Sequence, residues 1–211
     1  MSLFIRLSLA IAAILAFLSS ANADESAPGK HSIAVFAGRA TWTNYIQTIY
    51  SPWTMEMADI GVVGGAYSYR FGSVNELTGW SLPAAIGDHL YVEGELGVST
   101  RFGDEDMQEG WAAAYLRYDY LPWNDYVYTT IGVNTGLSYL TEISEFERSR
   151  DSKDDAAKLL HYMGPEITFA DPDNKNLELL VRYHHRSGVF GLFDGVVSGS
   201  TFITAGVRMR F

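Results

Sequence analysis

A histidine and a serine lie two residues apart near the end of residues 177–188, LELLVRYHHRSG, and this pair could carry out nucleophilic chemistry. If the stretch is a β-strand, alternate side chains share a face, so His185 and Ser187 project to the same side as Leu179 and Val181. Their α-carbons would be about 6.5 to 7 Å apart, which lets the imidazole meet the hydroxyl. A serine becomes a useful nucleophile when an imidazole accepts its proton and an acidic group orients that imidazole. The spacing therefore indicates acyl transfer to Ser187, with His185 as the base.

The same two residues also have a structural interpretation. Histidine is a common amphipathic residue at a membrane interface, and serine commonly ends a strand and begins a turn. His184 falls on the opposite face, beside Arg182 and Arg186, where we expect a structural role. From these residues alone, the structural interpretation is favoured.

The first residues predict export from the cytoplasm. The stretch MSLFIR carries one positive charge at Arg6, an apolar run of about 11 residues follows, and ANA at 21–23 is a small-x-small cleavage site. A helix that spans a bilayer needs roughly 20 apolar residues, so a retained anchor is less favoured. We expect residues 1–23 to be a removed signal peptide and residues 24–211 to be the mature chain.

The composition narrows the class of protein. Removal of the signal takes away only Arg6 of the 15 basic residues and none of the 25 acidic ones, so the mature chain is more negative than the formal −10 of the full sequence. That balance makes nucleic acid an unfavourable partner. The chain has no cysteine, so disulfides, thiolate metal sites and a cysteine nucleophile are excluded. Because there is no linker or internal repeat, we expect a single domain.

Eight segments of the chain alternate between an apolar phase and a polar or small one, as β-strands do. In the clearest segment, residues 89–101, the apolar phase runs from Leu90 to Val98, while Glu93 and Glu95 take the other phase. Gly164 and Pro165 interrupt the sixth segment. The eight segments are residues 31–39, 59–72, 89–101, 110–120, 126–139, 158–170, 177–188 and 200–211.

This pattern predicts an all-β chain folded as an eight-stranded antiparallel transmembrane β-barrel, with a soluble β-sandwich as the alternative. Apart from the gap at residues 72–87, long and short connections alternate, as in outer-membrane barrels. The region of residues 71–88 could form an extended hairpin or a plug-like turn. The chain also ends on a strand whose last residue is the aromatic Phe211. Aromatic residues recur near strand ends, as interfacial girdles require: Tyr67, Tyr69, Tyr118, Tyr120, Trp123, Tyr126 and Tyr183.

An eight-stranded barrel is just wide enough to be filled by its own side chains, so we expect no open pore. The phase opposite to the apolar one contains acidic and basic residues that can pair in the interior. We interpret this set as structural rather than catalytic: Glu93, Glu95, Asp119, Glu178, Arg70, Arg117, Arg182, Arg208 and Arg210.

The barrel interpretation also predicts where the His-x-Ser pair lies. If the first strand rises from the periplasm, the seventh strand ends at the cell surface, and His185 and Ser187 face the outer leaflet from the outside wall. An ester within reach there would be an acyl chain of a lipid. Basic residues near this end could meet lipid phosphates, although the last three are more simply solvated loop charges: Arg186, Arg148, Arg150 and Lys153.

Residues 182–211, RYHHRSGVFGLFDGVVSGSTFITAGVRMRF, resemble the lipid A 3-O-deacylase (PagL-like) family. The resemblance lies in a penultimate strand that ends in an arginine, an aromatic residue, a polar residue and His-x-Ser, followed by a glycine-containing loop and a last strand. It implies an outer-membrane esterase with a membrane-facing Ser-His-Glu triad that removes the 3-linked acyl chain of lipid A with no metal or cofactor. Carried over by position, Ser187 is the nucleophile and His185 the base.

The chain departs from the family pattern at two places. The family serine is followed by Asn-Ala-Gly, whereas this chain has Gly188 and then Val-Phe, so the oxyanion would rely on backbone N–H groups of residues 188–191. Val197 occupies the position where the family glutamate aligns. Asp194 is the nearest carboxylate and becomes the candidate acid if the loop folds back toward His185.

Two functions from different classes follow. The first is an esterase of lipid A, the lipid portion of lipopolysaccharide, with Ser187, His185 and Asp194 as its catalytic residues. The second is a non-catalytic outer-membrane barrel with a degraded triad and a structural or adhesive role in the envelope. We prefer the first because polar groups on a lipid-facing wall cost energy. A palmitoyltransferase-like barrel is disfavoured, since no N-terminal amphipathic helix is evident. Both main hypotheses place the chain among the lipids of the bacterial outer membrane, and a homodimer is compatible with either.

Overall fold

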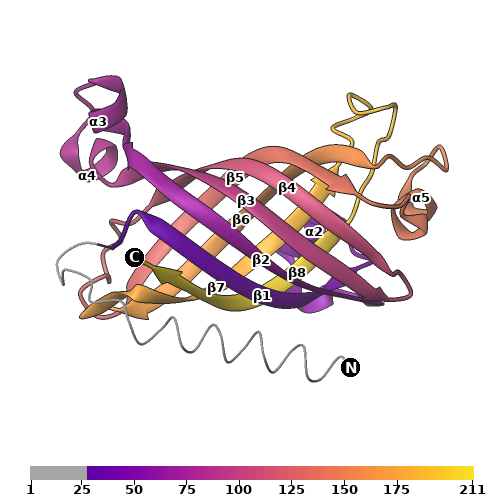
Figure 1. Cartoon of the computed structure of the whole chain (residues 1–211), viewed down its shortest axis with the longest axis horizontal. Helices are drawn as coiled ribbons and strands as arrows, with labels where there is room; N and C mark the ends of the chain where they lie inside the picture. Colours follow the sequence, from indigo (N-terminus) through magenta and orange to yellow (C-terminus); the bar gives the residue numbers. More distant parts are fainter. Residues whose placement is uncertain (1–27) are drawn as a thin grey trace.

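The computed structural model describes residues 28–211, which form a closed eight-stranded antiparallel β-barrel (Figure 1). Each strand pairs with the next in the chain, and β1 pairs with β8 to close the barrel. The predicted fold class is therefore confirmed, while the expected signal peptide, residues 1–23, lies outside the described residues. The strands are β1 (His31–Thr41), β2 (Met57–Ser73), β3 (Leu90–Gly103), β4 (Met107–Tyr118), β5 (Tyr128–Leu140), β6 (Leu159–Asp171), β7 (Asn174–Ser187) and β8 (Thr201–Arg210).

The strands alternate apolar side chains on the outside wall with polar and charged ones inside. Leu96 and Leu179 expose 63% and 62% of their surface, whereas Glu95 and Glu178 expose 3% and 0%. A soluble sandwich would bury the apolar side chains between its sheets. Here the apolar side chains are exposed and the charged ones are buried, which excludes the sandwich. The outside wall is an apolar band of the kind that faces lipid.

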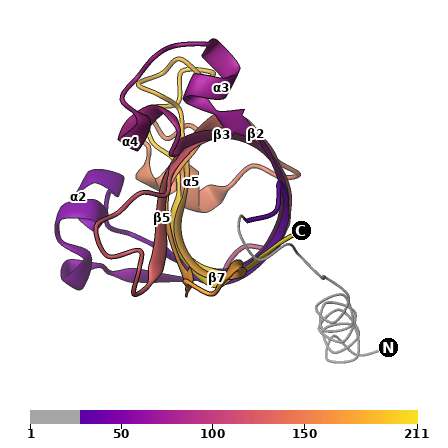
Figure 2. The same cartoon turned by 90° about the vertical axis from the view of Figure 1, so that its left-hand side faces the viewer.

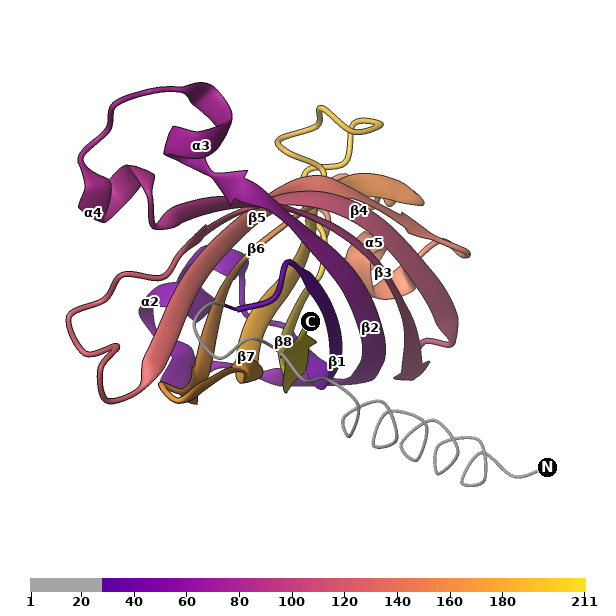
Figure 3. The ribbon, with the colours of Figure 1, turned by 60° about the vertical axis from the view of Figure 1, so that its left-hand side comes forward.

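The connections divide between the two ends of the barrel. The end that holds the start of β1 and the end of β8, here called the terminus end, carries α3 (Val74–Thr78) and α4 (Ala84–Gly87) between β2 and β3 (Figure 3). Two short helices thus lie in the region of residues 71–88, and a Ser73–Glu76 capping box begins the first of them. The opposite end, here called the site end, carries α2 (Tyr45–Tyr50), η1 (Pro52–Thr54), α5 (Glu145–Arg150) and the loop of residues 188–200. Within residues 28–211, no helix is long and apolar enough to cross a bilayer.

Ion pairs among buried arginines and glutamates fill the half of the interior near the terminus end. Glu166 is the clearest centre, because nitrogens of Arg117, Arg182 and Arg208 lie 2.7, 2.6 and 2.6 Å from its carboxylate oxygens. All four of these residues expose 1% of their surface or less. The other ion pairs of this half join Glu93 to Arg70, Arg117 and Arg210, Glu95 to Arg182, and Glu178 to Arg208 and Arg210.

A second ion-paired cluster lies near the site end. Its centre is Arg101, whose guanidinium lies 3.2 Å from each of Glu105, Glu109 and Glu147. The third of these belongs to α5, so the cluster fastens a loop helix to the barrel interior. Between the two clusters lies a layer of buried aromatic and aliphatic residues that includes Phe36, Trp111, Tyr162 and Leu180.

Most of the charges predicted to face inward are in these clusters, but Asp119 is not. Asp119 follows the end of β4, and its carboxylate lies 3.0 Å from His89 Nδ1 and accepts a hydrogen bond from the Tyr128 hydroxyl at 2.9 Å. It is therefore a residue of the terminus-end rim rather than of the interior. Glu166 was not predicted because Gly164 and Pro165 interrupt the alternation just before it.

Arg117→Ala should destabilise the barrel by roughly 3 to 5 kcal/mol, because it removes one buried ion pair from each of Glu93 and Glu166 and upsets the charge balance of the buried cluster. Urea unfolding in detergent micelles, followed by tryptophan fluorescence, measures the change. Arg148→Ala is the matched control, because Arg148 is paired only with the exposed Glu145 and should cost less than about 1 kcal/mol. Equal unfolding midpoints for Arg117→Ala and the wild type would contradict the structural role of the interior pairs.

Candidate functional site

His185 and Ser187 lie on the outside wall, at the site end of β7. Their neighbours His184 and Arg186 point into the barrel, where His184 Nε2 lies 2.8 Å from Glu109 Oε1 and Arg186 is fully buried. Because alternate side chains face opposite sides, the inward placement of these two residues goes with the outward placement of His185 and Ser187. It also means that Arg186 is not available to a lipid phosphate, which corrects the expectation from the sequence.

The imidazole of His185 is enclosed by side chains from two other elements. Its Nδ1 lies 2.8 Å from Oγ1 of Thr201, the first residue of β8. The ring of Tyr45 stacks on it, with centroids 4.2 Å apart and planes inclined by 13°. His185 therefore exposes only 9% of its surface although it lies on the outside wall.

Helix α2 carries Tyr45 and lies outside the ring of strands (Figure 2). Its first turn is capped by Asn44, whose side-chain oxygen accepts a hydrogen bond from the backbone N–H of Gln47 at 2.9 Å. The hydroxyl of Tyr183 on β7 donates to the carbonyl of Thr48 at 3.1 Å. These contacts hold the helix against the strand that carries the His-x-Ser pair.

Ser187 ends β7 and begins a turn with left-handed backbone angles. Its Oγ accepts a hydrogen bond from the N–H of Val189 at 3.1 Å, so its own proton remains available for donation. Val189, Phe190 and Gly191 have φ of 49°, 57° and 95°. This conformation costs of order 1 to 3 kcal/mol for a residue such as valine, and strain of this kind is concentrated at functional sites. The turn is therefore a candidate part of the site.

Asp194, the acid suggested by the sequence, does not meet His185 in this structure. Among residues 28–211, neither a hydrogen bond nor an ion pair joins the Asp194 carboxylate to the imidazole, whose Nδ1 is bonded to Thr201. Asp194 lies in the loop of residues 188–200, with φ of 52°. The structure thus brings His185 and Ser187 to the same wall and leaves Asp194 apart from them.

Asp151 is the carboxylate that binds the loop of residues 188–200. Its Oδ2 accepts hydrogen bonds from the N–H groups of Val197 and Ser198 at 2.6 and 2.8 Å, and its Oδ1 accepts one from Lys153 at 2.8 Å. Burial acts to raise the pKa of the Asp151 carboxyl, but these backbone donors outweigh it and lower the pKa below its usual value. A carboxylate therefore reaches the backbone at Val197, the position where the family glutamate aligns.

A second histidine of the outside wall, His161 on β6, lies directly across from Ser187. Its Nε2 lies 2.8 Å from Oγ1 of Thr135 on β5, and its Nδ1 is buried without a hydrogen-bond partner in the described part of the chain. We define the outer-wall polar row as Thr135, His161, Ser187, His185 and Thr201. This row crosses β5 to β8 near the site end.

Four residues of this site were not predicted from the sequence. Thr135 and Thr201 have the outward phase of their segments, and His161 has it in a segment interrupted by Gly164 and Pro165, so phase offered a weak signal for these three. Tyr45 belongs to a loop helix of six residues, too short for helical periodicity to be recognised.

The three other cations expected near this end have partners of their own. Arg148 pairs with Glu145 at 2.8 Å, Arg150 donates to the carbonyl of Thr41 at 2.7 Å, and Lys153 donates to the carbonyl of Gly195 at 3.2 Å.

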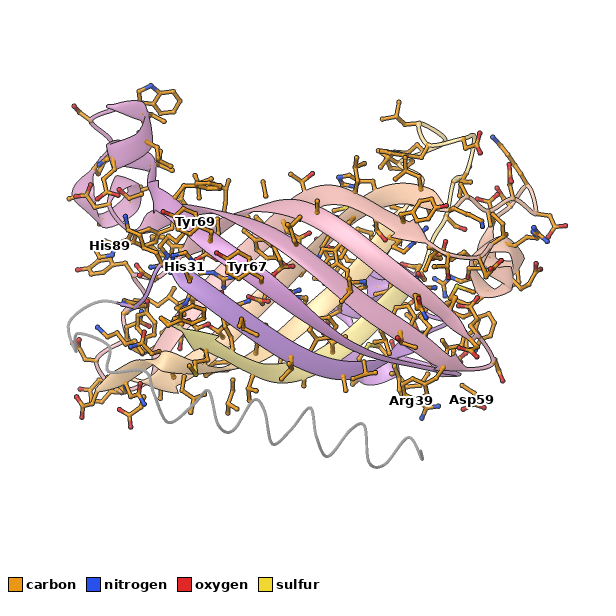
Figure 4. All side chains as sticks on the ribbon, in the orientation of Figure 1. His31, Arg39, Asp59, Tyr67, Tyr69 and His89 are labelled. Carbon is orange, nitrogen blue, oxygen red and sulfur yellow. The ribbon has the colours of Figure 1, made fainter. Side chains whose placement is uncertain are left out.

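Further polar side chains on the outside wall lie at both ends of the barrel (Figure 4). Arg39 pairs with Asp59 at 2.7 Å at the site end, and His31 Nδ1 lies 2.7 Å from the Tyr67 hydroxyl at the terminus end. Such residues are typical of the two interfaces of a membrane barrel.

No protein-family model and no curated protein matches the sequence. Among solved structures, the barrel is similar to the outer membrane enzyme PagL, with 12% identity, 85% of this chain and 99% of that chain covered, and a TM-score of 0.55. Neisserial surface protein A and the N-terminal β-barrel domain of Pseudomonas aeruginosa OprF are similar at 13% and 10% identity. Each of these two alignments covers 88% of this chain and 100% of the other protein's chain, and the TM-scores are 0.49 and 0.48.

The closed barrel, its apolar outside wall and its ion-paired interior define the class as that of eight-stranded outer-membrane β-barrels. At such low identity, the likeness to PagL shows this fold alone. It does not show membership of the lipid A 3-O-deacylase family.

The hydrogen bonds to Asp151 predict a pH-dependent loop. Because the pKa of Asp151 is lower in the folded chain, its carboxylate stabilises the loop above the unfolded-state pKa of about 3.9, and this contribution is lost as pH falls through the folded-state value. Amide exchange protection at Val197 and Ser198, measured by NMR, should fall on acidification below about pH 4. In Asp151→Ala the protection of these amides should be low at every pH. Asp155→Ala is the control and should keep normal protection, because the Asp155 carboxylate accepts a hydrogen bond only from the adjacent N–H of Ala156. Full protection in Asp151→Ala would be inconsistent with this anchoring.

Tyr45→Ala should uncover His185, because the tyrosine ring covers the face of the imidazole. Modification of His185 by diethyl pyrocarbonate, located by mass spectrometry, should become severalfold faster. Tyr50→Ala is the matched control, since Tyr50 belongs to the same helix but exposes 76% of its surface. Equal modification rates in the two variants would argue against Tyr45 as a cover.

Proposed function

We propose that this chain is an outer-membrane esterase that removes a 3-O-linked acyl chain from lipid A. In this proposal the site end faces the cell exterior, so the outer-wall polar row meets the leaflet that contains lipopolysaccharide. The observation that carries the proposal is the serine at the end of β7, whose hydroxyl proton is not donated to any described residue. It lies on the lipid-facing wall, two residues from His185 along the strand and opposite His161 on β6. The interior cannot serve this chemistry, because ion pairs and aromatic side chains fill it.

The reaction needs two acyl transfers. Ser187 Oγ attacks the carbonyl carbon of the ester while His185 accepts the hydroxyl proton. The bond between the acyl carbon and the 3-oxygen then breaks, and the proton passes from the imidazole to that oxygen, which leaves as a hydroxyl. Water attacks the acyl-serine in the same way, which releases the fatty acid and restores Ser187.

The orientation of His185 sets which nitrogen can accept that proton. When Nδ1–H donates to Thr201 Oγ1, Nε2 is left as the acceptor. Asp194 is the acid of the proposal, and it would take the place of Thr201 only after the loop of residues 188–200 moves toward the imidazole. Until then, the threonine hydroxyl orients the ring without supplying a negative charge.

Backbone N–H groups after Ser187 are the proposed oxyanion donors. Gly188 and Gly191 donate to the carbonyls of Ser198 and Gly188, so their N–H groups are occupied. The N–H of Phe190 has no hydrogen bond among the described residues, and that of Val189 points at the nucleophile. The left-handed turn thus leaves the N–H of Phe190 unbonded three residues after Ser187, as the proposed donor to the negative charge of a tetrahedral intermediate.

A non-catalytic envelope barrel is the second candidate function. The bond between His185 and Thr201 favours it, because a neutral hydroxyl supplies no charge to stabilise an imidazolium. The stack of Tyr45 favours it too, because it covers the imidazole.

Lipid A from cells that express the wild-type chain should lose one 3-linked hydroxyacyl chain, as measured by mass spectrometry. Ser187→Ala should abolish this loss because it removes the nucleophile. Ser149→Ala is the control, since Ser149 is an exposed residue of α5 that bonds only to a nearby carbonyl. Identical lipid A from wild-type and Ser187→Ala cells would refute the esterase and leave the non-catalytic barrel.

A further inference from the structure

We infer that His161 is a second proton acceptor for Ser187 and therefore a further catalytic residue of the outer-wall polar row. The inference rests on the proposed esterase function and adds to it a residue that the sequence resemblance does not contain. It follows from the pairing of β6 with β7, from the hydrogen bonds of the two wall histidines and from their exposure.

The strand pairing brings His161 nearer to Ser187 than a residue on the same strand can come. His161 and Ser187 are register partners, and both face outward. The α-carbons of directly opposed residues in an antiparallel pair are about 4.5 to 5.5 Å apart. The α-carbons of His185 and Ser187, two residues apart along β7, are separated by about 6.5 to 7 Å. On spacing alone, the cross-strand histidine is the better partner for the hydroxyl.

The hydrogen bonds of His161 leave it ready to accept a proton. When Nε2–H donates to Thr135 Oγ1, at 2.8 Å, the other nitrogen carries a free lone pair. That nitrogen, Nδ1, is buried without a partner among the described residues, which is costly for a polar atom in apolar surroundings. No hydrogen bond joins Ser187 Oγ to this nitrogen among the described residues, but a change of the Ser187 side-chain rotamer that brings Oγ to Nδ1 would satisfy the nitrogen and activate the nucleophile together.

His185 is the more restricted of the two histidines. Thr201 occupies its Nδ1, and Tyr45 covers its ring and leaves it 9% exposed. His161 is half-buried, and its register partner on the other side is Leu137, which exposes 47% of its surface. A lipid can therefore approach Ser187 along the apolar wall of β5 and β6 without displacing α2.

The chemical step is the same as that written for His185. The Ser187 proton passes to His161 Nδ1 as Oγ attacks the acyl carbon, and it then passes to the departing 3-oxygen. Thr135 acts as a positioning residue, because its hydroxyl holds the Nε2–H tautomer. His161 and His185 then flank one nucleophile, one across the strand pair and one along the strand.

Two measurements on the folded chain in detergent micelles test this inference. The first is NMR of the imidazole nitrogens, in which Ser187→Ala should shift the Nδ1 resonance of His161. The second is the rate at which a fluorophosphonate labels Ser187, which should fall by at least about 100-fold in His161→Gln. His31→Gln is the control, because His31 is an outside-wall histidine at the terminus end and should leave the rate unchanged.

The outcomes separate this inference from the proposed function. The inference is overturned if fluorophosphonate labels His161→Gln at the wild-type rate, or if Ser187→Ala leaves the nitrogen resonances of His161 unshifted. This holds even if the wild type deacylates lipid A. A different result would be that fluorophosphonate labels Ser187 of the wild type, and that both the slower labelling of His161→Gln and the Nδ1 shift in Ser187→Ala are observed, while lipid A stays intact. In that case lipid A is not the substrate, but His161 is still the proton acceptor of Ser187.

Discussion

The ion pairs inside the barrel determine which side chains reach the lipid. On β7, Arg182 binds Glu95 and Glu166, and two residues later His184 binds Glu109. A shift of the strand by one residue would turn these charges onto the apolar wall and bury Leu179 in their place. The register is therefore strongly specified, and it places His185 and Ser187 outside. The position of the candidate nucleophile is a consequence of pairing in the interior.

The same alternation explains how much of the fold could be predicted. A period of two is visible in a single strand, so the eight strands, their outward faces and most interior charges could be inferred segment by segment. Glu166 escaped because Gly164 and Pro165 interrupt the period just before it. The helices of the connections were not predicted because each has only three to six residues, and caps and tertiary contacts hold them rather than an amphipathic pattern.

The candidate site was predictable only where its residues share a strand. His185 and Ser187 are neighbours by spacing, which the sequence displays directly. The contacts of Thr201 and His161 depend on the register between strands, which no single segment reveals. The stack of Tyr45 on His185 depends on where a loop helix packs, and the distance of Asp194 depends on left-handed turns in the loop of residues 188–200.

The energetics of the outside wall separate the two candidate functions. A polar group that faces hydrocarbon without a partner costs several kcal/mol, roughly 2 to 7 for a hydroxyl or an amide. Thr201 and Thr135 each satisfy one nitrogen of a wall histidine, and Tyr45 shields one ring, so much of this cost is offset. What remains includes Nε2 of His185, the Ser187 proton and the unpaired Nδ1 of His161, the last two on residues opposed across one strand pair. An aliphatic residue, such as Leu137 beside them on β5, would avoid this cost, so the proposed esterase gives the polar pair a role that a purely structural wall does not require.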